Sequence, residues 1–190
     1  MIEELCPGGV ELKVLEEVAT TVSGLSGKTK ADFSDGNAMF ISYKNVFSNL
    51  SVDQSADDRV RVGANEKQNS MKFGDVIFTG SSESVEDVGM SSVVTTEPVE
   101  PLYLNSFCFA LRFMDENLID PTFSKYLFRS EQVRKQIKKT ASGVTRINIS
   151  KARFMKICIP IPPLEVQREI VRILDQFTEL EAELEAELEA

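Results

Sequence analysis

GVTRINISKARFMKICIPIPPLEVQREIVRIL, residues 143–174, is the stretch that decides the fold of this 190-residue chain. It joins a polar loop containing Gly143, Thr145 and Arg146 to a short apolar strand, and then to a helix that begins at a proline. The helix continues into a tail that reads ELEA three times, from residue 179 to residue 190. A loop, a strand and a long helix in this order indicate a recognition surface mounted on a spacer, and therefore binding rather than catalysis.

Prolines at positions 160, 162 and 163 end the strand, because the residue before a proline avoids the helical region. Pro163 can occupy the first turn of a helix. Apolar residues then recur at helical spacing, which predicts one helix over residues 163–190, about 40 Å long. A lone helix with one apolar stripe is not stable in water, so it needs a second copy or another subunit. The predicted dimerisation residues are Ile170, Ile173, Leu174, Phe177, Leu180, Leu184 and Leu188.

Residues 1–162 are predicted to form one α+β domain in which short strands outnumber helices. A short strand and one helical turn are expected within residues 6–18. Asp120-Pro121 is typical of a helix start, and an apolar stripe predicts a single basic helix from there to Lys139. The fold class is therefore α+β, with a mixed or antiparallel β-rich domain, a packed basic helix and a C-terminal coiled-coil helix. Further strands are expected at residues 39–47, 59–63, 74–79, 91–96 and 102–113, with a loop over residues 20–35.

Composition narrows the functions that the chain can have. It contains no histidine, which excludes Ser-His-Asp and Cys-His catalytic sites and histidine metal sites within this chain. Cys6, Cys108 and Cys158 form no CxxC pair, so we expect reduced thiols in a cytoplasmic protein. No apolar run reaches the roughly 18–20 residues of a membrane helix, and the N-terminus does not resemble a signal peptide. No metal site is expected.

The net charge of −9 is distributed very unevenly. Residues 125–156 contain ten basic residues and one acidic residue, which gives this block a charge of +9. The other 11 basic and 29 acidic residues give the rest of the chain a charge of −18. A basic block of this kind is typical of a phosphate-binding surface, although a solvated basic helix face would look the same. The basic residues are Lys125, Arg129, Arg134, Lys135, Lys138, Lys139, Arg146, Lys151, Arg153 and Lys156.

Reading a base requires side chains that present paired hydrogen-bonding groups to one base edge. Arg146 suits guanine and Asn148 suits adenine, although both can equally stabilise the loop. Gly143 would let the backbone approach DNA closely, and Thr145 could contact a phosphate or a thymine methyl group. The complete set of candidate DNA-binding residues comprises a second loop with Ser42, Lys44 and Asn45, together with Lys138, Lys139, Gly143, Thr145, Arg146, Asn148 and Lys151.

The segment INISKARFMKICIPIPPLEVQREIVRIL resembles the specificity subunit of type I restriction-modification systems. In that family a recognition domain ends in a loop, a strand and an Ile-Pro-x-Pro-Pro-Leu-x-x-Gln segment, at which a long helix starts. Leu164, Gln167, Ile170 and Ile173 fall on the expected positions. The segments GVELKVLEEVA (residues 9–19) and KFGDVIFT (72–79) are also similar to the family, so the resemblance covers most of the chain.

The resemblance implies a division of labour between subunits. Family members carry two target recognition domains and two such helices, and this chain has one of each, so it resembles a half-length form. Two copies are expected to associate through antiparallel helices and to read a symmetric bipartite site in double-stranded DNA. The chain itself would be non-catalytic and without cofactors. S-adenosylmethionine is expected on modification (methyltransferase) subunits, and ATP and Mg²⁺ on restriction subunits.

The ELEA copies resemble short repeats that some family members carry in the central helix. Each copy adds roughly 6 Å of helix, and DNA rises about 3.4 Å per base pair, so the repeats are expected to set the spacer length. An acidic tail that frays in solution is the plainer interpretation. A protein-interaction scaffold that docks through its helix is the alternative function, and an enzyme is a third, for which no site is evident.

Overall fold

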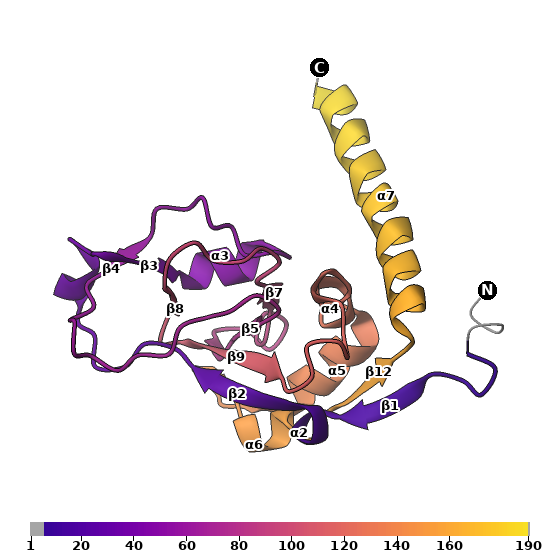
Figure 1. The fold of residues 1–190 in the computed structure, drawn as a ribbon, viewed down its shortest axis with the longest axis horizontal. Coiled ribbons are helices and arrows are strands. Elements are labelled where there is room, and N and C mark those ends of the chain that lie inside the picture. The colour runs from indigo at the N-terminus through magenta and orange to yellow at the C-terminus, as the bar shows by residue number, and fades with distance from the viewer. Residues whose placement is uncertain (1–5, 190) are drawn as a thin grey trace.

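The computed structural model describes residues 6–189 and has two parts, a β-rich body and one long helix that leaves it (Figure 1). This helix, α7 (Leu164–Glu189), has 26 residues and is therefore about 39 Å long. The mixed α+β class is confirmed. None of the helices in the described part of the chain has both the length and the hydrophobicity of a membrane span. Residues 1–5 and 190, which belong to the predicted domain and helix, lie outside the described part.

The body is built on both faces of one antiparallel sheet with strand order β2-β9-β5-β7. Successive side chains of a strand point to opposite faces of a sheet. Phe78 and Phe109 accordingly pack into one apolar cluster, whereas Ile77 and Ala110 pack into another. Because both faces are covered, β5 is buried along its whole length. The strands are β2 (Ala19–Ser23), β9 (Cys108–Phe113), β5 (Val76–Thr79) and β7 (Ser91–Val93).

Smaller sheets surround the central one. In the first, β3 (Ala38–Ile41) pairs antiparallel with β4 (Arg59–Val60) and parallel with β8 (Leu102–Leu104). In the second, β11 (Ile147–Ile149) lies between β10 (Ala141–Ser142) and β6 (Ser81–Ser82) and is antiparallel to both. In the third, β1 (Glu11–Val14) pairs antiparallel with β12 (Cys158–Ile161). The helical turn α2 (Leu15–Val18) joins β1 to β2, which confirms the strand and turn predicted near the N-terminus.

Two predictions about the central sheet are wrong. The loop predicted over residues 20–35 contains most of β2 and the 3-10 helix η1 (Lys30–Phe33). Since β2 lies at the sheet edge and three of its five residues are exposed, it has no apolar run that would reveal it.

The single strand predicted over residues 102–113 is two strands, β8 and β9. A turn separates them, in which the Oδ1 of Asn105 accepts a hydrogen bond from the backbone N–H of Phe107 (2.9 Å).

The strand predicted over residues 39–47 is wrong in its second half. The chain leaves β3 at Ile41 and forms the helix α3 (Tyr43–Ser48). The Oγ of Ser42 accepts a hydrogen bond from the backbone N–H of Asn45 (3.4 Å), and an N-cap of this kind favours a helix start. The predicted second DNA-binding loop is therefore the beginning of a short helix.

The single basic helix predicted to reach Lys139 is two helices, α4 (Pro121–Leu127) and α5 (Glu131–Thr140). Its start is confirmed, because the carboxylate of Asp120 accepts a hydrogen bond from the backbone N–H of Thr122 (2.8 Å). The helices are separated at residues 128–130.

The break between α4 and α5 is caused by tertiary packing. Phe128 is fully buried, with its ring centroid 5.2 Å from that of Phe78 in an edge-to-face arrangement. Ser130 has an extended backbone and starts a new helix. Packing at this point overrides an apolar stripe that is continuous in the sequence.

The first turns of α7 are fixed to the body by Gln167. Its side chain is completely buried. The Oε1 atom accepts a hydrogen bond from the backbone N–H of Asp120 (2.7 Å), and Nε2 donates to the carbonyls of Pro162 (2.8 Å) and Leu118 (3.2 Å). One glutamine therefore joins α7, the end of β12 and the start of α4.

Asp175 forms a second attachment of α7, two turns further along. It accepts hydrogen bonds from the Nζ of Lys125 (2.8 Å) and from the hydroxyl of Tyr126. Partial burial raises the pKa of Asp175, but these two hydrogen bonds outweigh it, so the pKa lies below its ordinary value. Beyond Asp175, Figure 1 shows the helix extending away from the body.

Candidate nucleic-acid interface

The polar loop of the opening segment is the turn of the β10–β11 hairpin. Gly143 has a φ of +137°, and a Cβ at this position would lie 2.0 Å from the carbonyl oxygen of Arg146. Only glycine can therefore occupy it, because a side chain would collide with backbone. The turn presents Thr145 and Arg146 on an exposed surface. The backbone of the turn therefore requires glycine at position 143, whether or not DNA approaches it.

The hairpin forms one wall of an open groove of about 880 Å³. Lys44 of α3, Thr145 and Arg146 all line this groove, so the structure brings together residues from both predicted loops. Serines of the segment that follows β5 also line the groove, as do two carboxylates, Glu83 and Asp87. A groove that contains exposed basic groups and small polar side chains can accommodate a phosphate backbone and hydrogen-bond a base edge.

Arg146 has the arrangement expected of a base-reading residue. The side chain is exposed, and among the described residues its guanidinium forms no hydrogen bond or ion pair. Its guanidinium carbon lies 4.7 Å from the centre of the Phe107 ring. The Nδ2 of Asn148 donates to the Arg146 carbonyl (3.1 Å), so Asn148 stabilises the hairpin while its side chain remains exposed. Both of the roles considered for Asn148 are therefore compatible with its position.

Ser42 and Asn45 are occupied inside the protein. Asn45 is buried, and its Nδ2 donates to the carbonyl of Asp53 (2.7 Å) while its Oδ1 accepts from the backbone N–H of Asp53 (3.0 Å). The hydroxyl of Ser42 caps α3. Of the three residues predicted for the second loop, Lys44 alone is exposed, and we leave Ser42 and Asn45 out of the candidate interface.

Part of the +9 block is used to hold the fold together. The guanidinium of Arg129 donates to the carbonyls of Ser91 (2.8 Å) and Phe47 (3.1 Å), and burial lowers the pKa of Arg129 to about 10. Arg134 is buried and donates to the carbonyls of Gly89 (2.6 Å) and Val88 (2.8 Å). These two arginines are therefore unavailable to DNA, and the charge count overstates the phosphate-binding surface.

Three lysines of the block are paired with carboxylates, and one of these pairs, Lys135 with Glu131, lies within α5. Lys125 pairs with Asp175 on α7, and Lys138 pairs with Glu86 in the segment between β6 and β7. The Lys138 hydrogen bond, followed by its charge, holds the pKa of Glu86 below its ordinary value. Lys138 is therefore a weaker candidate for phosphate than its neighbour Lys139, which is exposed.

Two further basic residues lie next to the hairpin. Lys151 begins the helix α6 (Lys151–Phe154), with its Nζ 5.3 Å from the ring centre of Phe109. Arg153 donates a hydrogen bond to the Oγ of Ser142 (3.1 Å) in β10. The exposed basic residues of the block are Lys135, Lys139, Arg146, Lys151, Arg153 and Lys156.

Sequence reasoning missed Phe107. We assigned it to the apolar face of a strand, whereas it lies in the β8–β9 turn and is 52% exposed in the groove. The sequence contains one signal that could have located it, because Asn105-Ser106 is a typical turn pair in the middle of an otherwise apolar run. Tyr43 was also missed as a groove residue; its hydroxyl donates to the carbonyl of Ser81 (2.9 Å).

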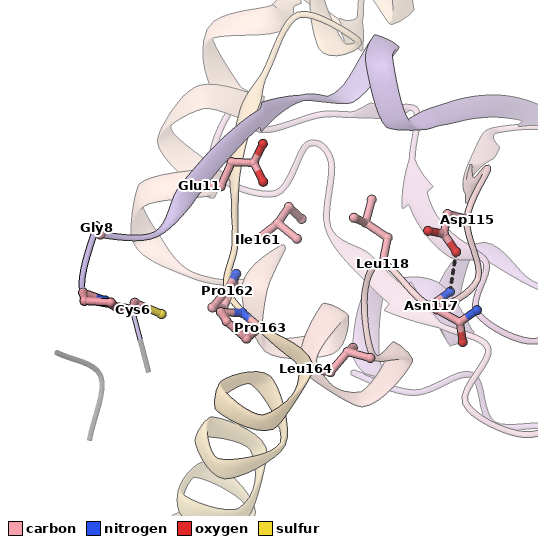
Figure 2. Close-up of a pocket in the computed structure, with 12 residues that line it drawn as sticks. Cys6, Gly8, Glu11, Asp115, Asn117, Leu118, Ile161, Pro162, Pro163 and Leu164 are labelled. Carbon is pink, nitrogen blue, oxygen red and sulfur yellow. Dashed lines mark hydrogen bonds between the residues drawn. The ribbon is translucent and has the colours of Figure 1, made fainter. Parts of the chain in front are cut away.

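A second cavity, of about 490 Å³, lies where α7 leaves the body (Figure 2). Leu118 and Ile161 line it together with Glu11 and Asp115, and Asp115 accepts a hydrogen bond from the backbone N–H of Asn117 (2.9 Å). Its polar groups are acidic or neutral, so it is unsuited to phosphate. Among the described residues there is no group of three or more Cys, Asp or Glu side chains that could hold a metal ion.

Comparison with known proteins identifies the family. The family model for the type I restriction modification DNA specificity domain matches residues 7–190. The type I restriction enzyme StySPI specificity subunit of Salmonella potsdam is 30% identical over 173 residues, which are 89% of this chain and 36% of that protein. The putative type I restriction enzyme MjaX specificity subunit of Methanocaldococcus jannaschii is 31% identical over 111 residues, covering 57% of this chain and 25% of that protein.

Solved structures agree on the fold. The HsdS subunit from Thermoanaerobacter tengcongensis superimposes with a TM-score of 0.62 at 21% identity, over 95% of this chain and 40% of that one. The chain thus spans well under half the length of these relatives. These relatives are specificity subunits, which are non-catalytic. The similarity therefore agrees with the expectation that this chain is non-catalytic. By its sequence match and its fold, this chain belongs to the family of type I restriction-modification DNA specificity domains.

Proposed function

We propose that this chain is the DNA-recognition half of a type I specificity subunit, and that two copies together read a symmetric bipartite site. The observation that carries the proposal is the groove between α3 and the β10–β11 hairpin, in which the exposed guanidinium of Arg146 has no polar partner among the described residues. Residues 1–162 would form the recognition domain, and residues 163–190 would form the spacer and dimerisation helix.

The groove suggests how DNA is read. Arg146 can donate two hydrogen bonds to the O6 and N7 atoms of a guanine in the major groove, and Asn148 can pair with an adenine. Thr145 lies beside them in the same turn. Lys44, Lys139 and Lys151 would neutralise phosphates, which contributes affinity and orientation but no sequence preference.

Dimerisation is supported by an apolar stripe along the free part of α7. Neighbouring residues of the stripe are four, three, four and four positions apart in the sequence. The first three spacings are those of a coiled-coil seam, and the last one departs from that pattern. Ile170 packs against the body cluster and Leu174 is half-buried, so we leave both out of the seam. The proposed seam comprises Ile173, Phe177, Leu180, Leu184 and Leu188, whose exposed fractions are 39%, 61%, 54%, 59% and 81%.

Charge favours an antiparallel arrangement of the two helices. In parallel helices the two glutamate-rich repeat segments would lie side by side and repel each other. In an antiparallel pair, each acidic segment would lie along the first turns of the other helix, where Arg168 and Arg172 are exposed. This arrangement would place the two recognition domains at opposite ends of the seam, facing two inverted half-sites.

The proposal extends to partners. We propose that the paired chains direct modification subunits, which would bind S-adenosylmethionine, and restriction subunits, which would bind ATP and Mg²⁺. A protein-interaction scaffold without DNA binding would use the same apolar stripe, so the stripe alone does not separate the two functions. A measurement of DNA binding separates them.

Replacing Arg146 by alanine tests the DNA-binding function. Loss of a bidentate contact is expected to relax the preference for one base by roughly 5- to 150-fold, with a smaller loss of affinity for unrelated DNA. Lys139→Ala is the control, because loss of a phosphate contact weakens binding to all sequences and lowers the salt slope by about one. A gel-shift titration at several salt concentrations, with the modification subunit present, measures both. If Arg146→Ala changes neither affinity nor sequence preference, the hairpin does not read DNA.

A further inference from the structure

Phe107 and the β10–β11 hairpin are tied to the same residue, Gly80. The backbone N–H of Gly80 donates to the carbonyl of Phe107 (2.8 Å), and the carbonyl of Gly80 accepts from the backbone N–H of Ile149 (2.9 Å). A Cβ on Gly80 would lie 2.9 Å from the Phe107 carbonyl oxygen, so the close approach requires glycine. The ring of Phe107 and the turn that carries Arg146 are therefore held in a fixed relation, although about 40 residues separate them in the sequence.

The ring of Phe107 is the group that contacts the guanidinium of Arg146. The guanidinium carbon lies 4.7 Å from the ring centre, which is within the range of a cation–π interaction. Among the described residues, the Arg146 side chain has no carboxylate or carbonyl partner that could fix its orientation instead. A free arginine side chain samples many rotamers, and ordering it on binding DNA would reduce both affinity and discrimination.

A stacked arginine keeps its hydrogen-bonding edge free. When an aromatic ring lies against one face of the planar guanidinium, the N–H groups project within the plane, where a base edge can accept them. Phe107 itself is 52% exposed, so its ring is accessible from the groove. The ring and the guanidinium both line the groove.

We propose that Phe107 is a positioning residue for base recognition: its ring holds the Arg146 guanidinium in the orientation from which it reads a guanine. This inference rests on the proposed function and adds a specificity determinant to it. Phe107 acts through Arg146 and has no base contact of its own in this arrangement. Changes at the two positions should therefore alter the preference at the same base pair of each half-site.

The test compares four variants in the complex of the full chain with its modification subunit, using sequencing of the methylated sites. Arg146→Ala should lose the preference at one base pair of each half-site. Phe107→Leu should weaken the preference at the same base pair by about two- to five-fold, which is the contribution of an exposed cation–π contact. Phe107→Tyr keeps an aromatic face and should restore the preference. Phe73→Leu is the matched control, because Phe73 is 50% exposed and lies outside the groove.

Thermal melting of each variant separates a loss of specificity from a loss of folding. The inference is wrong if Phe107→Leu leaves every position of the motif unchanged, lowers all positions equally, or alters a base pair other than the one that Arg146→Ala alters. The last result would indicate that the ring contacts a base directly. A wild-type complex that methylates without any motif would overturn the proposed function itself, and this inference with it.

Discussion

Replacing Gln167 by leucine is expected to lower the free energy of unfolding by about 3 kcal/mol. The side chain is fully buried and satisfies the N–H of Asp120 and the carbonyls of Leu118 and Pro162. Leucine has a similar size but no polar atom, so these three backbone groups would be left buried without partners. Urea denaturation at a fixed chain concentration measures the change, because the proposed dimerisation would make stability depend on concentration.

Gln176→Leu is the matched control for this prediction. Gln176 lies on the same helix, is exposed, and accepts a single hydrogen bond from Arg172 (3.3 Å). Its replacement should change stability by less than about 0.5 kcal/mol. Equal effects of the two substitutions would mean that Gln167 does not attach α7 to the body. That result would also mean that the glutamine at this position of the family's sequence pattern does not have the structural role that we assign to it.

Replacing Leu180 and Leu184 by glutamine should dissociate the proposed dimer. Each leucine is more than half exposed in the single chain, and burying one typically contributes 1.5–3 kcal/mol. Two substitutions affect four side chains in a symmetric pair, so the dissociation constant should rise by roughly 1,000-fold or more. Glutamine has nearly the helix propensity of leucine, so α7 itself should remain helical. Sedimentation equilibrium over a range of concentrations measures the association.

Glu181→Gln together with Glu185→Gln provides the control, since these residues are adjacent to the two leucines but lie off the stripe. They change the same number of positions to the same residue. This variant should change the association far less than the leucine substitutions do, because it leaves the apolar stripe intact and removes only exposed charges. A chain that stays monomeric without any substitution, or equal weakening by both pairs, would contradict the proposed seam.

Much of the architecture could be predicted from local patterns. Asp120-Pro121 marks a helix start because the side chain and the ring act within one turn, and the structure confirms it. Two of the errors concern places where the chain changes direction. The apolar alternation of residues 102–113 continues through the β8–β9 turn, and the stripe of residues 121–139 continues across the break between α4 and α5. Periodicity describes which face is apolar and does not show where an element ends.

The candidate site was predicted in part. The turn residues Thr145 and Arg146 were identified by their chemistry, and Lys44 proved to line the same groove. The charge count failed for Arg129 and Arg134, because the carbonyls that bind them come from segments about 40 to 80 residues away. Phe107 was missed for a related reason. Its significance comes from a contact with Arg146 that exists only after the strands have paired.

The most direct test of the account is to sequence the DNA that is methylated by the proposed complex of this chain with a modification subunit. The unmodified chain should give two inverted copies of one half-site separated by a spacer of fixed length. Adding one ELEA copy lengthens each helix by roughly 6 Å and should lengthen the spacer by about one or two base pairs, with the half-sites unchanged. A single uninterrupted site, two unrelated half-sites, or a half-site sequence that changes with repeat number would contradict the claim that two copies of this chain form one symmetric reader.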